Sequence, residues 1–209
     1  VSSVGNIIQR GGTILQTSRS QEFMTVEGRA KAATNLKQHN IDSLIVIGGN
    51  GSFKGAMKFF DEHAIPVAGI PGTIDNDISG TDYTIGFDTA VQVAIKAVDR
   101  IRDTASSHDR TFLVEVMGRS SPAIAIHVAV CTGAENIVFS QQEIQYDKIS
   151  EHIKRGVARG KNSSIIIVTE GDKPGLAYQV QEKLHKDFNL DAHVCILGHI
   201  QRGGAPSHM

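Results

Sequence analysis

The sequence is poor in cysteine and has none of the spacings that would give cysteine a chemical role. Cys131 and Cys195 are the two cysteines among 209 residues, and both stand in apolar surroundings without metal-ligand spacing. We therefore expect buried, free thiols in a reducing compartment, and neither disulfides nor a metal centre built on cysteine.

Long apolar runs and an excess of either charge are lacking as well. No apolar run approaches the roughly 20 residues that a membrane-spanning helix needs, and the N-terminus has no signal-peptide pattern. The formal net charge is -1, so we expect no binding to nucleic acid or to a membrane. Hydrophobic residues make up 40% and charged residues 21%, which is typical of a globular protein with a substantial core. We expect a cytoplasmic protein.

Apolar segments of strand length alternate with amphipathic segments of helical length. The nearly continuous β-branched character of the strand-like segments is typical of strands covered on both faces. The alternation predicts an α/β fold with parallel sheets flanked by helices, in which ligands bind at the carboxyl ends of the strands. The expected strands are 42–47, 66–70, 112–116, 136–139, 164–168 and 193–197, and the expected helices are 26–39, 53–63, 87–106, 149–159 and 176–188.

A glycine-rich loop, Gly48-Gly49-Asn50-Gly51-Ser52, separates the first expected strand from a helix. Glycines allow backbone N–H groups to approach a phosphate, and a helix N-terminus favours an anion. Ser52 is the expected N-cap, and Gly55 keeps the first turn open. We favour phosphate binding over a plain strand-to-helix turn. The loop has neither the G-x-G-x-x-G spacing of a dinucleotide site nor the Gly-Lys-Ser/Thr of a Walker loop.

A second motif, PGTIDND at 71–77, follows the next expected strand. Its carboxylates, Asp75 and Asp77, and the hydroxyl of Thr73 could supply a base and a group that orients a metal. Phosphoryl transfer asks little more of a protein than these groups and correct positioning. From this motif alone, an Asp/Asn turn bonded to its own backbone is an equally good interpretation.

Together with TIGFDTA, EVMGR and LGHIQRGG further along, these motifs resemble those of bacterial ATP-dependent 6-phosphofructokinases (family A) over almost the whole chain. The resemblance implies a cytoplasmic glycolytic kinase that transfers a phosphoryl group from ATP to fructose 6-phosphate, with Mg²⁺, as a homotetramer. Lipid kinases and NAD kinases share a GGDG-type loop but lack the later motifs. Glycines at 51 and 72 favour ATP, because a pyrophosphate-using relative is expected to have Asp and Lys there.

The resemblance also implies two lobes and assigns residues to them. Residues 1–86 form part of a nucleotide-binding lobe, 87–200 a sugar-phosphate lobe, and 201–209 the start of a return to the nucleotide lobe. Asp75 is the implied base for the sugar 1-hydroxyl, with Thr73 and Arg119 at the transferring phosphoryl group. The residues implied to bind the nucleotide are Arg19, Gly49, Asn50, Gly51, Ser52 and Gly55. The residues implied to bind Mg²⁺ are Asn50 and Asp77. The residues implied to bind the sugar phosphate are Thr73, Asp75, Arg110, Met117, Gly118, Arg119, Glu170, His193, His199 and Arg202.

A second anion site, for an ADP or phosphoenolpyruvate effector, is implied at Arg102, Gly133, Glu135, Arg159 and Lys161. From the residues alone, Arg159 and Lys161 suit equally well an ordinary basic helix C-terminus.

Two of the implied site residues depart from the pattern of the family. Asn50 stands where an aspartate near Mg²⁺ is usual, and His193 where an arginine reaches the 6-phosphate from a neighbouring subunit. These departures favour an alternative, a catalytically weak paralogue or regulatory subunit that binds nucleotide or sugar phosphate; the presence of Asp75 and Arg119 opposes it. The sequence starts at Val1 without Met and lacks the family's opening GGDxPG loop, so we expect a piece of a longer protein, with impaired activity in this form.

Overall fold

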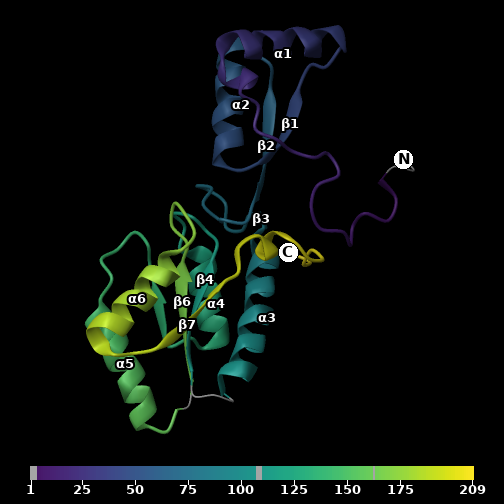
Figure 1. Cartoon of the computed structure of the whole chain (residues 1–209). Coiled ribbons are helices and arrows are strands. Elements are labelled where there is room, and N and C mark those ends of the chain that lie inside the picture. Colours follow the sequence, from purple (N-terminus) through teal and green to yellow (C-terminus); the bar gives the residue numbers. More distant parts are fainter. Residues whose placement is uncertain (1–3, 107–109, 162) are drawn as a thin grey trace. The chain divides into compact units, whose positions relative to one another are not determined.

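A computed structural model describes residues 4–106, 110–161 and 163–209 (Figure 1). By its contacts the chain divides into two compact units. The smaller unit consists of Gly12–Thr73 and Asp77–Ile85. The larger unit consists of the residues up to Gly11, of Ile74–Asn76 and of Gly86–Met209. Each unit is described by itself.

The smaller unit has a short sheet of order β1-β2-β3, in which β1 and β2 pair in parallel. Its small core is formed by Ala33, Phe59 and Ile65. The buried guanidinium of Arg29 makes two hydrogen bonds to Glu62, at 2.6 and 2.7 Å, and thereby joins the two helices. The elements are η2 (Glu22–Met24), α1 (Val26–Gln38), β1 (Leu44–Gly48), α2 (Asn50–His63), β2 (Val67–Thr73) and β3 (Ile85–Gly86).

The larger unit is a parallel four-stranded sheet between two pairs of helices (Figure 1). The strand order is β5-β6-β4-β7, so β4 and β6 are central. The elements are α3 (Phe87–Ser106), β4 (Thr111–Val116), α4 (Ala123–Thr132), β5 (Asn136–Val138), α5 (Tyr146–Ala158), β6 (Ser164–Thr169), α6 (Leu176–Phe188), β7 (Ala192–Ile196) and η3 (Gly198–Arg202).

Strand β6 shows how the sequence produces the layers of the larger unit. All of its residues are buried. Ile165 and Ile167 join the core under α3 and α4, whereas Ile166 and Val168 join the core under α5 and α6. Because successive side chains of a strand point to opposite faces, a continuous run of β-branched residues suits a strand with helices on both sides. This confirms the predicted α/β fold.

All six predicted strands and all five predicted helices are present, with ends that shift by a few residues. Helix α4 was not predicted, because it is apolar on nearly every side and therefore shows no helical alternation of apolar and polar residues. The prediction of Ser52 as N-cap is wrong. Gly49 has the extended backbone of an N-cap and Asn50 is already helical, so Ser52 lies inside the first turn of α2.

The expectation that both thiols are buried is wrong for Cys131. Its neighbours in sequence are apolar, but α4 turns this side chain outward and leaves it exposed. Cys195 is half-buried on β7, and burial raises the pKa of its thiol. None of the helices in the described part of the chain is long and apolar enough to cross a membrane.

Residues 201–209, expected to begin a return to the nucleotide lobe, group with the larger unit, where Ser207 N donates to Thr89 Oγ1 at 3.0 Å. Residues 74–76 group with the larger unit as well. The binding functions of the two units remain predictions.

Replacing Ile166 by alanine is expected to destabilise the larger unit. Ile166 is fully buried at the centre of β6, and loss of such a side chain leaves a cavity and costs about 2–5 kcal/mol of unfolding free energy. Urea unfolding of the 209-residue chain, followed by circular dichroism, measures the change. Tyr178→Ala on α6, where the side chain is 57% exposed, serves as the control and should change the free energy of unfolding by less than about 1 kcal/mol. Equal losses in the two variants would contradict the described core.

Candidate functional site

Three strands of the larger unit deliver polar residues to one edge of its sheet. Parallel pairing of β4 with β6 and β7 places their carboxyl ends side by side. The turn Met117-Gly118-Arg119 follows β4, Glu170 follows β6, and η3 follows β7 with His199 and Arg202. The structure thus brings together residues that the sequence holds up to 85 positions apart, since 202 − 117 = 85.

The turn after β4 has an unusual backbone that its neighbours hold in place. Gly118 has a φ of 137° and Arg119 a φ of 50°, both in the left-handed region that residues with a side chain rarely adopt. A Cβ on Gly118 would lie 2.7 Å from the carbonyl oxygen of Ser121. Met117 N donates to Gln201 Oε1 at 2.8 Å, and Gln141 Nε2 donates to the carbonyl oxygen of Arg119 at 3.0 Å. The turn therefore presents the Arg119 side chain, which is exposed, from a fixed backbone.

Glu170 is a buried carboxylate at the centre of this edge. Its surroundings raise its pKa, mainly because burial disfavours the charged form. The backbone N–H groups of Arg119 and Gly118 donate to it and oppose this effect, whereas the negative charges of Asp75 and Glu115 add to it. Asp75, from the PGTIDND motif, therefore lies within electrostatic reach of Glu170 in the larger unit. Carboxylates with such shifts are enriched at functional sites.

Two buried residues at this edge were missed by the sequence analysis. Gln201 is 1% exposed and holds the backbone of Met117, and Glu115 is fully buried on β4. For Glu115, the signal in the sequence is a single carboxylate within the apolar run FLVEV. For Gln201, it is an amide between the basic residues His199 and Arg202 of GHIQRGG. Such groups within a buried segment usually have a specific hydrogen-bond partner. Gln201 finds one through Oε1, whereas its buried Nε2 has no partner among the described residues.

Arg110 and His193, expected with the others at the sugar phosphate, lie at the opposite edge of the sheet. Arg110 immediately precedes β4, and His193 is opposite Phe112 in the pairing of β4 with β7, with their rings 5.3 Å apart. At about 3.3 Å per residue, the six residues of β4 separate the two edges by about 20 Å. Within one chain, Arg110 and His193 therefore do not reach a phosphate held by His199 and Arg202.

The amino edge also carries the residues expected at an effector site. Glu135, just before β5, forms an ion pair with Lys161 and accepts a hydrogen bond from the backbone of Ile165. Arg102 Nη2 donates to the carbonyl oxygen of Thr132 at 2.6 Å. The neighbouring Gly133 ends α4 in the left-handed conformation, and Arg159 ends α5. Glu135 and Lys161 are thus in contact, as a shared site requires.

The glycine loop of the smaller unit leaves the start of α2 open to a ligand. Its N-cap, Gly49, has no side chain to accept from the first N–H groups of the helix. An added Cβ on Gly51 would meet no atom within 4 Å, so the space beside this backbone is open. At Gly48 a Cβ would lie 2.4 Å from Ser52 Oγ, so this position needs glycine. Free N–H groups at a helix start, without a competing side chain, suit a phosphate.

Asn50 and Asp77, the two expected metal ligands, form a hydrogen-bonded pair. Asn50 Nδ2 donates to Asp77 Oδ2 at 2.8 Å and lies 3.4 Å from the carbonyl oxygen of Asp77. The described residues contain no group of three or more His, Cys, Asp or Glu arranged to hold a metal ion. Mg²⁺ is commonly held by one or two carboxylates together with the phosphates of a nucleotide. One carboxylate and one amide fit that pattern, with less negative charge than two aspartates.

Thr73, predicted at the transferring phosphoryl group, and the remaining predicted nucleotide residues also lie in the smaller unit. The Thr73 side chain lies beside Gly49, and its carbonyl oxygen accepts from Thr84 Oγ1 at 2.6 Å. Gly55 lies on α2 against the ring of Phe23. Arg19 lies in an exposed segment without regular structure.

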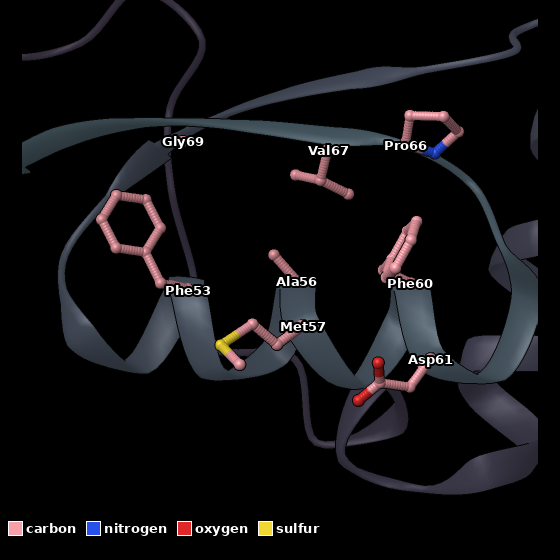
Figure 2. Close-up of a pocket in the computed structure, with 8 residues that line it drawn as sticks. All are labelled: Phe53, Ala56, Met57, Phe60, Asp61, Pro66, Val67 and Gly69. Carbon is pink, nitrogen blue, oxygen red and sulfur yellow. The ribbon is translucent and has the colours of Figure 1, made fainter.

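An apolar groove between α2 and β2 is a further hollow in the smaller unit. Figure 2 shows Phe53, Ala56 and Phe60 of α2 directed toward the strand, with Pro66 opposite Phe60. Asp61 is its one charged lining residue, and none of the predicted site residues lines it. This groove lacks the polar groups that phosphate chemistry requires, so we do not assign the site to it. Its lining consists of Phe53, Ala56, Met57, Phe60, Asp61, Pro66, Val67 and Gly69.

The sequence is similar to known proteins along its whole length. Residues 1–209 match the family described as Phosphofructokinase. Two curated relatives, the ATP-dependent 6-phosphofructokinase 1 of Thermus thermophilus and the ATP-dependent 6-phosphofructokinase of Bacillus subtilis, are each 52% identical over 207 residues, or 99% of this chain. The chain spans 64% of the length of each of these relatives.

Solved structures agree with the sequence relatives. The phosphofructokinase of Pichia pastoris in the T-state has a TM-score of 0.85 at 35% identity, over 97% of this chain and 24% of that one. The phosphofructokinase of Saccharomyces cerevisiae has a TM-score of 0.84 at 33% identity, over 95% of this chain and 30% of that one.

Asn50→Asp is expected to tighten the binding of a divalent cation to the chain. The substitution replaces a hydrogen bond with two neighbouring carboxylates, which repel each other until a cation lies between them. We expect the dissociation constant for Mn²⁺ to fall by roughly tenfold, which corresponds to a gain of about 1.4 kcal/mol in binding free energy. Electron paramagnetic resonance with ADP present measures this constant. Asn50→Ala, which removes the hydrogen bond without adding charge, is the control. Equal Mn²⁺ affinity in the two variants would exclude position 50 from the cation site.

Proposed function

Because the chain belongs to the phosphofructokinase family, we propose that its gene product transfers the terminal phosphoryl group of ATP to O1 of fructose 6-phosphate, giving fructose 1,6-bisphosphate and ADP. The observation that carries this proposal is the grouping of Asp75, Arg119 and Glu170 at the carboxyl edge of the larger sheet, with the basic residues of η3. The edge offers a base, cations and a hydroxyl acceptor, as transfer to a sugar phosphate requires.

At the sugar, each group acts at a stated atom. Asp75 accepts the proton of the sugar's 1-hydroxyl while the oxygen of that hydroxyl attacks the terminal phosphorus of ATP. The bond between this phosphorus and the ADP oxygen breaks, and ADP leaves. Arg119 and Thr73 stabilise the charge on the transferring group. Glu170 accepts hydrogen bonds from sugar hydroxyls, with Met117 and Gly118 lining the sugar. His199 and Arg202 bind the 6-phosphate, for which the planar fork of an arginine is well suited.

At the nucleotide, the open start of α2 binds phosphate through backbone N–H groups. Gly49, Gly51 and Ser52 provide these groups, and Arg19 adds positive charge. Gly55 lies in the second turn of the same helix, against the ring of Phe23. Asp77 and Asn50 would hold Mg²⁺, which neutralises charge on the phosphates when it is bound.

The position of Arg110 and His193 supports sharing of the site between copies of the chain. At about 3.3 Å per residue, Arg110 lies about 20 Å and His193 about 13 Å from the carboxyl end of β4, so we propose that they reach the 6-phosphate bound by a neighbouring copy in a homotetramer. The contact between Glu135 and Lys161 supports an effector site for ADP or phosphoenolpyruvate, with Arg102, Gly133 and Arg159. A cytoplasmic, glycolytic setting is part of the same proposal.

A second function is favoured by Asn50 and His193. A weak paralogue or regulatory subunit would bind the same ligands and modulate a partner with little turnover of its own. ADP release by the full-length gene product, coupled to a detection enzyme and measured with both substrates, distinguishes the two. Turnover within the usual range of kinases, 1–100 per second, supports the enzyme, and binding without turnover supports the regulatory subunit.

Asp75→Asn in the full-length gene product should lower kcat by roughly 10²–10⁴-fold, the usual contribution of a positioned base. The affinity for fructose 6-phosphate should change little, because the amide keeps the size of the carboxylate. Steady-state kinetics give kcat, and calorimetry gives the dissociation constant of the sugar phosphate. A kcat within a few-fold of the parent would remove Asp75 from the mechanism.

His193→Arg should tighten binding of fructose 6-phosphate at pH 8 by about tenfold or more. Arginine carries a permanent charge and a planar fork of donors, and a hydrogen bond to a charged group contributes about 1.5–3 kcal/mol. Calorimetric titrations of both proteins with fructose 6-phosphate at pH 8 provide the test. Equal affinity at pH 8 would show that residue 193 does not contact the phosphate.

A further inference from the structure

Glu115 is a fully buried carboxylate near the carboxyl end of β4, a central strand of the larger sheet, where it pairs with Val168 of β6 and Ile196 of β7. A buried charge is costly unless hydrogen bonds replace its water. Both oxygens of Glu115 have such partners: Oε1 accepts from Gly175 N at 2.7 Å, and Oε2 accepts from Ala177 N at 2.8 Å. The carboxylate therefore binds the start of helix α6.

Helix α6 depends on this contact because it has no side-chain cap of its own. Its N-cap is Gly175, with a φ of 115° and no side chain to accept from the first N–H groups. A serine or aspartate at the N-cap usually makes that hydrogen bond. Glu115 does so from a strand 60 residues earlier, and its charge lies at the positive end of the helix dipole.

The segment that Glu115 fixes at one end carries Glu170 at the other. Gly171–Gly175 connects the end of β6 to α6, and both of its terminal glycines have a positive φ. Glu170 is also bound to the turn after β4, through the N–H groups of Gly118 and Arg119. Glu115 is thus connected with Glu170 in two ways. One is its contact with the start of α6, which the Gly171–Gly175 segment joins to Glu170, and the other is its own strand, β4, which leads into the turn that binds Glu170. Its carbonyl oxygen additionally accepts from Leu197 N at 3.0 Å, just before η3.

We propose that Glu115 is a positioning residue for sugar-phosphate binding, which holds the Gly171–Gly175 segment and thereby the carboxylate of Glu170. The inference rests on the proposed function, in which Glu170 accepts hydrogen bonds from sugar hydroxyls. A carboxylate needed only for stability would lower the apparent kcat through the amount of folded protein and leave both KM values unchanged. A positioning carboxylate affects the sugar phosphate selectively.

The charge of Glu115 provides a second, independent readout. The charges of Glu115 and Asp75 raise the pKa of Glu170. The hydrogen bonds from the N–H groups of Gly118 and Arg119 lower the same pKa. Sugar binding requires ionised Glu170, so it weakens as the pH falls through that pKa. Removal of the negative charge at position 115 lowers the pKa of Glu170 and moves this weakening to lower pH.

Glu115→Gln in the full-length gene product is the main test. Glutamine keeps one acceptor but turns an NH₂ group against an N–H donor of α6, which leaves both unsatisfied. We expect the KM for fructose 6-phosphate to rise roughly 10- to 100-fold, the usual effect of losing a charged hydrogen bond, and the KM for ATP to stay within about twofold. The acid limb of fructose 6-phosphate binding should shift to lower pH.

Two further variants separate positioning from stability. Glu62→Gln, in the smaller unit, also removes a carboxylate with two hydrogen bonds, to Arg29 at 2.6 and 2.7 Å. We expect it to lower the temperature of unfolding without changing the KM for fructose 6-phosphate. Glu115→Asp keeps the charge but is one methylene shorter, so the KM for fructose 6-phosphate should rise while the acid limb stays near that of the parent. This variant decides the question if Glu115→Gln does not fold.

Several results would overturn the inference: an unchanged KM for fructose 6-phosphate in a folded Glu115 variant, an equal rise in both KM values, or an unshifted acid limb in Glu115→Gln. If neither variant folds, hydrogen exchange of the unmutated protein decides, since fructose 6-phosphate, but not ATP, should protect the backbone of 171–177. The proposed function fails separately, if calorimetry detects no binding of fructose 6-phosphate to the unmutated protein.

Discussion

Strand β4 pairs in parallel with β6 on one side and with β7 on the other, and this pairing is the constraint on which the larger unit depends. It places the carboxyl ends of three strands at one edge, so that the residues following them converge although they are far apart in sequence. It also places the residues preceding these strands at the opposite edge. The chain thus carries two sets of anion-binding candidates separated by the length of a strand. If these sets serve one reaction, copies of the chain must share them.

The buried polar groups determine how accurately the carboxyl edge is built. Apolar packing of the isoleucines of β6 fixes the layers, but it does not fix the turn after β4 or the segment after β6. Gln201 and Glu115 do so: Gln201 accepts from the backbone N–H of Met117, and Glu115 accepts from those of Gly175 and Ala177. Such groups are costly to leave unsatisfied, which makes the loop geometry specific where hydrophobic contact alone would allow alternatives.

At the start of α2 the chain shows an electrostatic compromise. The open backbone around Gly51 suits a phosphate, while Asn50 adds no negative charge that would attract a cation and donates to a carboxylate oxygen of Asp77. Phosphate binding and cation binding therefore need not change together at this position. This is why Asn50, by itself, decides neither for the kinase nor for the regulatory subunit.

The sequence by itself determined the fold class, the six predicted strands, five of the helices and the motifs that carry the family resemblance. Periodicity and glycine placement are local properties, so they are legible without the tertiary structure. Helix α4 was not predicted, because a helix that is apolar all round has no period to detect. Only the tertiary structure decided that Arg110 and His193 lie at the amino edge, that Asn50 donates to Asp77, and that Glu115 caps a helix that begins 61 residues later, since 176 − 115 = 61. Each of these depends on strand pairing or on contacts between distant residues, which no local pattern encodes.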